Sequence, residues 1–493
     1  MTSAASLKQP RSSQKPKAKS QKPKAKSQKP KAKSQNSQKC KKRLNSLAKL
    51  AAKSPKTRKP MALSAFRKKL SQSSLSSDFG QISSISTTSI ELKGLRTSPG
   101  DVLRLQNEQK SALAMVVKVD ESTSYLSPFD FIEGFRVGDR AYLELSGLQI
   151  PCSSGLLGRV VDPFMRPKDG KGPICMESDA LNMDIMSEPI EAMKRGLITE
   201  LFPVGVRSID AILTCGKGQK MGIFAGSGVG KSTLMGMIVR GSKSAAVKVV
   251  ALIGERGREV PEFIHKNLGG ELADTVLIVA TSDDSALMRK YGAFCAMSVA
   301  EFFKNQGKDV LFIMDSVTRF AMAQREIGLA SGEPPTSKGY PPSVFGLLPQ
   351  LMERAGKEEG KGTITAFFTV LVDGDDLSDP IADQSRSILD GHIVLDRKLT
   401  DFGIYPPINI QNSASRVMSE VASREHVELA RRFKRLNSLL KENEVLLRIG
   451  AYQKGGDPEL DLAVAKREYM QQFLSQDADE IIPLESSLEE LAR

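Results

Sequence analysis

The chain has 493 residues, enough for two or three domains, and its 71 basic and 57 acidic residues give a formal net charge of +14. Five scattered cysteines and three widely separated histidines argue against a structural zinc site, histidine metal chemistry and a Ser-His-Asp triad. The sequence contains neither a long apolar run typical of a transmembrane helix nor an apolar signal-peptide segment, so we expect a soluble or peripheral protein in a reducing compartment.

The basic charge is concentrated at the start of the chain. Residues 1–70 contain 23 Lys and Arg and no acidic residue, which leaves 48 basic and 57 acidic residues for the rest. The segment Ser13–Lys19 recurs at 20–26 and at 27–33, with a proline in each copy. Proline opposes helix and like charges repel, so we expect residues 1–75 to be a disordered Lys/Pro/Ser-rich extension.

Two roles remain open for this extension. It is either a solubilising addition, which we favour, or a means of attachment to acidic lipid or an acidic partner. A transit peptide is a weaker interpretation, because arginine is scarce in the repeat. Apolar residues return between Lys41 and Leu70, where a short amphipathic helix is expected.

Residues 80–165 are predicted to form a small β-barrel domain. Short β-type runs alternate with turn residues there, at Ser89–Leu92, Met115–Val119, Ala141–Leu145 and Gly158–Val161. Several short strands at regular spacing are typical of a barrel or sandwich.

Residues 166–410 alternate between strand-like and helical stretches, which predicts an α/β domain with a parallel sheet and crossover helices. The expected strands are Met221–Phe224, Val247–Ile253, Thr275–Val279, Val310–Met314 and Thr365–Leu371. Residues 411–493 are predicted to form a helical C-terminal domain, because apolar residues recur there with the helical period.

The most informative motif follows the first of these strands. A glycine-rich turn between a buried strand and a helix is the context that a phosphate-binding loop needs, because backbone N–H groups and the helix N-terminus surround the phosphates. We assign nucleotide binding to Ala225, Gly226, Ser227, Gly228, Val229, Gly230, Lys231, Ser232 and Thr233. Lys231 is expected to reach the β- and γ-phosphates and Ser232 to bind Mg²⁺. Ala225 replaces the first glycine of the motif, which is acceptable if its φ is negative.

Two further strands end in acidic residues. Val310–Asp315 places Asp315 at the carboxyl edge of the sheet, where it is expected to hold the Mg²⁺ shell beside the phosphate loop. Glu255 follows Val249–Ile253 and could polarise the attacking water, with Arg256 on the γ-phosphate. From spacing alone, a simple pairing of Glu255 with Arg256 in a turn is almost equally plausible.

At this point the chain resembles a known family over about residues 85–475. It is similar to the flagellar protein-export ATPases of the type III secretion ATPase family, which are related to the catalytic subunit of rotary F-type ATP synthases. The motifs that carry the resemblance are Leu157-Gly-Arg-Val, Gly222–Thr233, Leu252-Ile-Gly-Glu-Arg-Gly-Arg-Glu, Phe312-Ile-Met-Asp-Ser-Val-Thr-Arg, Gly339-Tyr-Pro-Pro-Ser-Val-Phe and Pro380–His392.

The resemblance implies a RecA-like P-loop core and specific roles for individual residues. Glu255 matches the catalytic glutamate of the family, and Arg256 matches the arginine beside it. Tyr405 matches the aromatic residue that packs on adenine. Arg416 matches an arginine finger that reaches the nucleotide of the neighbouring subunit, so the active form is expected to be a homohexameric ring.

The function implied is ATP-driven protein export, with ATP and Mg²⁺ as cofactors. The implied partners are stalk, regulator and gate proteins of the flagellar apparatus and chaperone–substrate complexes, at the cytoplasmic face of the membrane. The C-terminal stretch Arg448–Asp461 favours an export ATPase over a rotary synthase subunit. A virulence secretion ATPase remains an alternative. A hexameric RNA translocase is less favoured, because the barrel region has few aromatic residues and is not notably basic, so we expect no specific nucleic acid partner.

Overall fold

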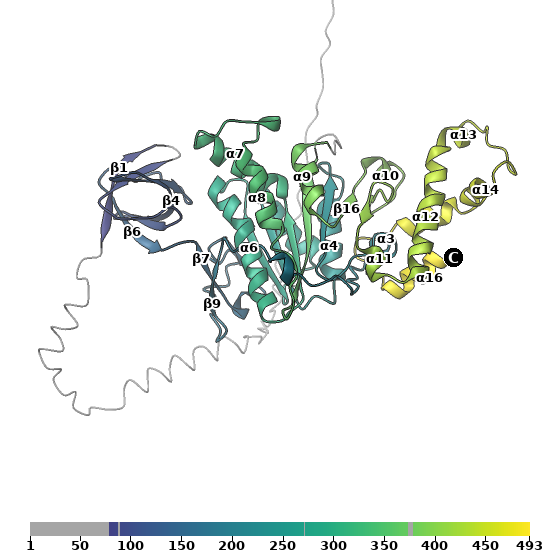
Figure 1. The fold of residues 1–493 in the computed structure, drawn as a ribbon, viewed down its shortest axis with the longest axis horizontal. Coiled ribbons are helices and arrows are strands. Elements are labelled where there is room, and N and C mark those ends of the chain that lie inside the picture. Colours follow the sequence, from purple (N-terminus) through teal and green to yellow (C-terminus); the bar gives the residue numbers. More distant parts are fainter. Residues whose placement is uncertain (1–77, 87–88, 271, 373–377) are drawn as a thin grey trace, which may run out of the picture. The chain divides into compact units, whose positions relative to one another are not determined.

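The computed structural model describes residues 78–86, 89–270, 272–372 and 378–493 (Figure 1). The basic extension and the amphipathic segment expected between Lys41 and Leu70 lie outside the described residues, so both remain predictions. No helix of the described part is long and apolar enough to span a bilayer.

The first described region is a closed antiparallel barrel of six strands, as expected (Figure 1). Around the barrel they run β1 (Phe79–Ile85), β2 (Ile90–Lys93), β5 (Thr123–Pro128), β4 (Ser111–Val119), β3 (Val102–Gln106) and β6 (Arg140–Leu145). Alternate residues point inward, so that Ile82, Leu92, Leu103 and Leu126 are almost completely buried. This period of two explains why the region reads as a series of half-buried strands.

The barrel ends at Leu145, and one expected strand belongs elsewhere. Val160–Val161, which we predicted within the barrel region, form β8 and pair in parallel with β12 (Thr275–Ala280) at the edge of the central sheet. Both valines are buried there. A two-residue apolar run fits the barrel and the central sheet equally well, so its place cannot be predicted from the sequence and is seen only in the folded structure. The connection also contains a small ladder of β7 (Gln149–Cys152) and β9 (Leu181–Asp184).

The central sheet has nine strands and is parallel apart from β14 and β17. In spatial order the path runs β17 (Ala414–Ser415), β16 (Gly391–Val394), β10 (Lys220–Ala225), β15 (Thr363–Leu371), β13 (Val310–Asp315), β11 (Val247–Ile253), β12 and β8, with β14 (Gly356–Lys357) beside β15. Its strands are buried on both faces. In β11, Val249 and Ala251 pack into one apolar core and Val250 and Leu252 into the other.

Helices cover the sheet, as the alternation of elements predicts (Figure 1). They are α3 (Arg207–Ile212), α4 (Lys231–Gly241), α5 (Glu259–Glu262), α6 (Ala286–Asn305), α7 (Val317–Ala330), α8 (Pro342–Met352), α9 (Pro380–Ile388) and α10 (Arg397–Asp401). Residues of α6 pack in one core and residues of α4 in the other, so these two helices lie on opposite faces.

The C-terminal region is helical, as expected. Its elements are α11 (Met418–Val421), α12 (Arg424–Glu442), α13 (Glu444–Arg448), α14 (Pro458–Ala465), α15 (Arg467–Leu474) and α16 (Leu484–Ala492). One apolar stripe of α12 turns toward the protein, where Phe433 and Leu436 are buried.

Hydrogen bonds tie the C-terminal helices to the segment before α3. The Gln476 side chain accepts from the Arg207 amide and donates to the Gly205 carbonyl, both at 2.8 Å. Asp210 is buried and accepts from the Val204 and Gly205 amides, each at 2.8 Å, and this burial raises the pKa of Asp210 to about 7. The same segment touches the end of α4, because a Cβ on Gly241 would lie 2.0 Å from the Val204 carbonyl oxygen.

Candidate nucleotide-binding and catalytic site

The phosphate-binding motif forms the expected strand, turn and helix. β10 ends at Ala225 and α4 begins at Lys231. Between them Gly228 and Gly230 have φ values of 76° and 100°, which L side chains rarely adopt. Ala225 is not among the non-glycine residues with positive φ, and its buried position at the end of β10 explains why a methyl group replaces the first glycine. The loop between β10 and α4 therefore has a conformation in which backbone N–H groups and the N-terminus of α4 can face an anion.

The structure brings Lys231, Glu255 and Asp315 together at the carboxyl edge of the sheet. The Lys231 ammonium donates a short hydrogen bond to Asp315 Oδ1 and lies 3.4 Å from Glu255 Oε1. β11 and β13 are neighbouring parallel strands with Leu252 opposite Asp315, so Glu255, which follows the end of β11, lies at the same edge of the sheet as Asp315. The predicted convergence of a phosphate-loop lysine with two strand-end acids is thus present in the geometry.

The three groups are largely removed from solvent, with side-chain exposures of 11%, 14% and 4% for Lys231, Glu255 and Asp315. Burial lowers the pKa of Lys231, but the two carboxylates outweigh it and raise the pKa overall, so the ammonium remains charged. Burial and the Asp315 charge raise the pKa of Glu255 to about 7, against the opposing effect of Lys231. A carboxylate with that pKa is matched to accepting a proton near neutral pH.

The donor set fits Mg²⁺ held together with phosphates. Among the described residues no group of three or more His, Cys, Asp and Glu side chains could hold a metal by itself. Mg²⁺ commonly uses only one or two protein oxygens and completes its shell with water and phosphate. Asp315 is fixed for this purpose by the Thr369 hydroxyl, which donates to Oδ1 at 2.7 Å, and the Ser232 residue at the start of α4 is exposed.

Tyr405 lies in a loop that adjoins the phosphate loop. The Tyr405 residue is 53% exposed. Two residues further on, Pro407 Cδ would lie 3.9 Å from a Cβ placed on Gly230. Arg397, which precedes this loop, donates to the Ser227 carbonyl at 2.5 Å. The loop around Tyr405 is therefore held beside the phosphate loop, and the tyrosine is exposed.

Arg256 and Arg416 are not part of the buried cluster. The Arg256 side chain is 66% exposed and lies 3.7 Å from Glu259. The backbone amide of Arg416 donates to the Asp390 carbonyl and its guanidinium to the Arg386 carbonyl. Within the described residues, no hydrogen bond or ion pair of Arg416 reaches the phosphate loop.

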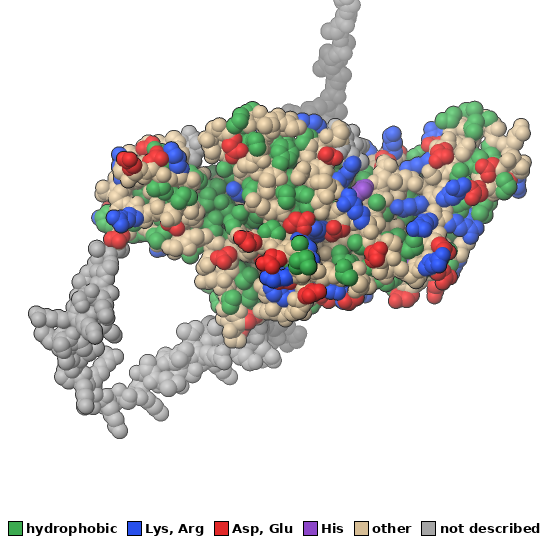
Figure 2. Space-filling view, viewed as in Figure 1, with side chains coloured by type: hydrophobic (Ala, Val, Ile, Leu, Met, Phe, Trp, Pro, Cys, Tyr) green, Lys and Arg blue, Asp and Glu red, His purple; other side chains and the backbone are tan. Residues whose placement is uncertain are grey.

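Arg416 lies in a positively charged neighbourhood. Burial and then the charges of Arg386 and Arg416 lower the pKa of His392, so these cations lie close together. Figure 2 shows lysine and arginine side chains gathered on the face that carries α9, β16 and α12. This surface suits a polyanion that approaches from outside the chain.

The structure adds residues that the sequence did not indicate. Arg319, in α7, packs against the backbone beside Glu255, because a Cβ on Gly254 would lie 2.7 Å from Arg319 Cβ. The Arg319 Nε is buried and has no hydrogen-bond partner. Asn267 donates to the Ser232 carbonyl at 2.7 Å and so supports the first turn of α4. The spacing of Arg319 four residues after Asp315, on the helix that follows the strand, is the one signal that could have drawn attention to it.

Two family profiles match the chain. The nucleotide-binding domain of the ATP synthase alpha/beta family matches residues 205–415. The C-terminal domain of the type III secretion ATPase EscN matches residues 422–493. The boundary between the profiles lies close to the start of the helical C-terminal region.

Similar proteins match over nearly the whole described chain. A flagellum-specific ATP synthase of Helicobacter pylori is 61% identical over 433 residues, which cover 87% of this chain and 99% of that protein. A flagellum-specific ATP synthase of Bacillus subtilis is 48% identical, covering 83% and 93%. A type 3 secretion system ATPase of Xanthomonas euvesicatoria is 42% identical, covering 87% and 97%.

The fold also matches a solved assembly. The structure of the assembled ATPase EscN from the enteropathogenic E. coli type III secretion system has a TM-score of 0.78 and 45% sequence identity, covering 84% of this chain and 99% of that one. EscN in complex with its central stalk EscO gives the same TM-score at 44% identity. The phosphate loop, the strand order and these similarities lead to one conclusion: the chain belongs to the family of flagellum-specific ATP synthases and type III secretion ATPases.

Proposed function

We propose that this chain is the ATP-hydrolysing component of the flagellar type III protein export apparatus, which energises chaperone release and delivery of substrate proteins to a membrane export gate. The observation that carries the catalytic part is the cluster of Lys231, Glu255 and Asp315 at the end of the phosphate loop. The flagellar assignment is supported by an identity of 61% to a flagellum-specific relative, compared with 42% and 45% to two type III secretion ATPases. The virulence alternative is therefore not favoured.

Each residue of the cluster has a distinct part in hydrolysis. The Lys231 ammonium would leave its carboxylate partners for the β- and γ-phosphates, where it balances developing negative charge. Glu255, whose pKa lies near 7, would orient the attacking water and accept its proton. Ser232 and Asp315 would hold Mg²⁺, which would supply positive charge against the phosphate groups.

The remaining proposed residues act at the edges of the site. Tyr405 would pack on adenine from a loop already held beside the phosphate loop. Arg256 has a mobile, exposed guanidinium able to turn toward the γ-phosphate. Arg319 would contact the same phosphate, since its buried Nε lacks a partner next to the Gly254 turn.

The proposed active form is a homohexamer in which Arg416 serves the nucleotide of the next subunit. Two features of Arg416 support this: the residue is exposed, and its guanidinium bonds to the Arg386 carbonyl rather than to its own phosphate loop. The assembled state of the similar ATPase EscN supports the ring. A stalk partner is supported by the EscN complex with EscO. Regulator and gate proteins, chaperone–substrate complexes and a position at the cytoplasmic membrane face complete the proposal.

The proposal is tested by deletion of the gene and scoring of motility and of secreted filament subunits. We expect both to be lost, to return with the wild-type gene and not to return with Lys231→Ala. Normal filament secretion in the deletion strain would reject flagellar export. Restoration by Lys231→Ala would instead reject the need for ATP hydrolysis.

A further inference from the structure

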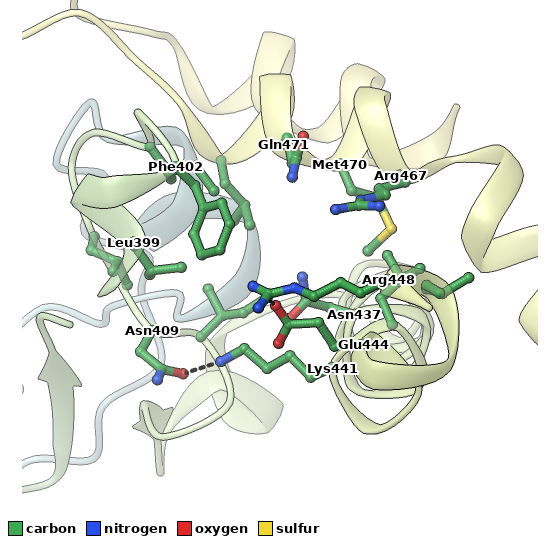
Figure 3. A pocket seen from close by; sticks show the side chains of 16 residues that line it. Leu399, Phe402, Asn409, Asn437, Lys441, Glu444, Arg448, Arg467, Met470 and Gln471 are labelled. Carbon is green, nitrogen blue, oxygen red and sulfur yellow. Dashed lines mark hydrogen bonds and ion pairs between the residues drawn. The ribbon is translucent and has the colours of Figure 1, made fainter. Parts of the chain in front are cut away.

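A cavity of about 170 Å³ lies between the Tyr405 loop and the C-terminal helices (Figure 3). One wall is formed by Leu399, Ile404 and Ile408 on either side of Tyr405. The opposite wall comes from α12, α13 and α15, where Leu440, Leu447 and Met470 line it. Ile408 and Met470 are each only 2% exposed, so the floor is built into the fold. The site is smaller than the usual 300–1,000 Å³ of drug-sized pockets, which indicates a ligand with one ring or a short acyl chain.

The rim of this cavity carries more positive than negative charge. Lys441, Arg448 and Arg467 line it together with one acidic residue, Glu444. Arg448 donates to Glu444 at 2.5 Å, and Lys441 donates only to the Asn409 side chain at 3.4 Å. Arg467 forms no ion pair within the described residues. Two cations therefore remain without a carboxylate at the mouth of an apolar cavity.

Figure 3 shows how these groups converge. The side chains of Phe402, Arg448, Arg467 and Gln471 point into the same space from three different elements. The Phe402 residue is 54% exposed and its ring lines the cavity, so part of an apolar ring is accessible to a ligand there. An apolar body with one negative charge would cover the phenylalanine and neutralise an arginine at once.

We propose that this cavity binds a small amphipathic anion, an aromatic or short acyl carboxylate, and that its occupancy is coupled to nucleotide binding. The coupling follows from the wall that both sites share. The loop through Tyr405 has Ile404 and Ile408 in the cavity and Pro407 against Gly230 of the phosphate loop. If binding of one ligand changes the conformation of this loop and so the affinity for the other ligand, the second ligand changes the affinity for the first by the same factor.

The test uses two fluorescent probes that have a single ring and differ in charge: salicylate, which is anionic, and salicylamide, which is neutral. Their fluorescence is titrated with the full-length wild-type chain and with Arg467→Gln, Leu447→Trp and Arg432→Gln. Arg467→Gln removes a rim charge, and Leu447→Trp fills the cavity without changing charge. Arg432→Gln is the matched control, because Arg432 is exposed on α12 and does not line the cavity.

We expect Arg467→Gln to weaken the binding of the anionic probe about fivefold or more and to leave the affinity for the neutral probe unchanged. Leu447→Trp should abolish the saturable site for both probes, and Arg432→Gln should alter neither. Octanoate should displace the anionic probe. Unchanged binding of the anionic probe in Leu447→Trp would overturn the location, and equal effects of Arg467→Gln on both probes would overturn the charge selectivity. Failure of octanoate to compete would overturn the class of ligand.

Coupling is measured by titrating the anionic probe with and without saturating Mg-ADP, and by titrating a fluorescent ADP analogue with and without octanoate. Both affinities should shift by the same factor, about fivefold. The coupling would be overturned if each probe bound with the same affinity in the presence and in the absence of the other ligand. Because the readout is binding rather than export or turnover, a failure here leaves the proposed export function untouched, and the reverse is also true.

Discussion

The cluster of Lys231, Glu255 and Asp315 is held in place by contacts within one chain, whereas the exposed Arg416 side chain makes few hydrogen bonds with the described part of its own chain. Lys231 contacts both Glu255 and Asp315, all three side chains are mostly buried, and Thr369 donates to Asp315. Arg416 is exposed and is fixed only through main-chain carbonyl groups of Arg386 and Asp390. The contrast shows that the buried groups are preorganised within one subunit, whereas the exposed arginine is accessible to another molecule.

The largest expected effect on ATP hydrolysis comes from a substitution in the buried cluster. Lys231→Ala should reduce ATP hydrolysis by more than about 1,000-fold, because the phosphates lose their cation in both the bound state and the transition state. Steady-state phosphate release measures the effect, and circular dichroism checks that the variant is folded. Normal turnover in a folded variant would remove the phosphate-loop assignment.

Arg416→Ala should lower kcat by about 1,000-fold and leave nucleotide affinity nearly unchanged, because a finger contacts the neighbour's nucleotide mainly in the transition state. Turnover and fluorescent-nucleotide binding are measured on the same preparation. Arg424→Gln is a suitable control, since that side chain is 94% exposed and lies at the start of α12.

Mixing the two inactive variants gives the sharpest form of the comparison. Rings of Lys231→Ala and Arg416→Ala subunits contain some interfaces that pair an intact phosphate loop with an intact arginine. Partial activity should therefore return. Mixed hexamers that form but show no recovery would place Arg416 in its own subunit's site or outside catalysis.

Glu255→Gln should lower kcat by about 100-fold or more with ATP still bound, because the amide keeps the shape of the side chain and cannot accept a proton. A filter-binding or fluorescence assay of affinity accompanies the kinetic measurement. Equal loss of affinity and turnover would make Glu255 a structural residue.

The pKa of Glu255 leads to a smaller, graded effect. The base acts when deprotonated, so kcat/KM should rise with pH and level off above an inflection near 7, the value set by burial and Asp315. The Glu259 carboxylate also raises the pKa of Glu255, so Glu259→Gln should move the inflection to lower pH. Glu262→Gln on the same helix should not move it. An inflection near 4.5 in the wild type would show that Glu255 is not the titrating base.

Removal of residues 1–40 should have the smallest effect on chemistry. It deletes 12 Lys and Arg and no acidic residue, and no proposed catalytic group precedes residue 220. ATPase activity per assembled ring should be unchanged, whereas any binding of the full chain to anionic liposomes should weaken upon truncation and with added salt. An assembled truncated ring that loses most of its turnover would show that the extension belongs to the motor.

The convergence of Lys231 and Asp315 was predictable from the sequence, and the position of Arg416 was not. Strand ends of a parallel sheet meet at one edge, so a phosphate loop after one strand and acids after two others had to lie close together. Position in the sheet was therefore enough to predict that Lys231 and Asp315 lie together, whereas for Glu255 the spacing left a simple turn pairing with Arg256 almost equally plausible. The position of Arg416 depends on β17 pairing with β16, and its role came only from resemblance.

Other parts of the site depend on packing between distant segments. Thr369 and Asp315 are 54 residues apart, and Asn267 and Ser232 are 35 apart, with no motif joining either pair. The pairing of Val160–Val161 with β12 is invisible for the same reason, because a short apolar run carries no information on its partner. Sequence periodicity predicts elements and their faces, while these contacts require the folded arrangement.

The position of α4 has a mechanical consequence. Its eleven residues form a rod about 16 Å long, with the phosphate loop at one end and Gly241 against Val204 at the other. The Asp210 carboxylate of α3 holds the amides of Val204 and Gly205, and the Gly205 carbonyl accepts a hydrogen bond from Gln476, which follows α15 in the C-terminal region. A rod without a flexible joint passes a displacement at one end to the other, so a shift at the phosphates becomes a push on the C-terminal helices.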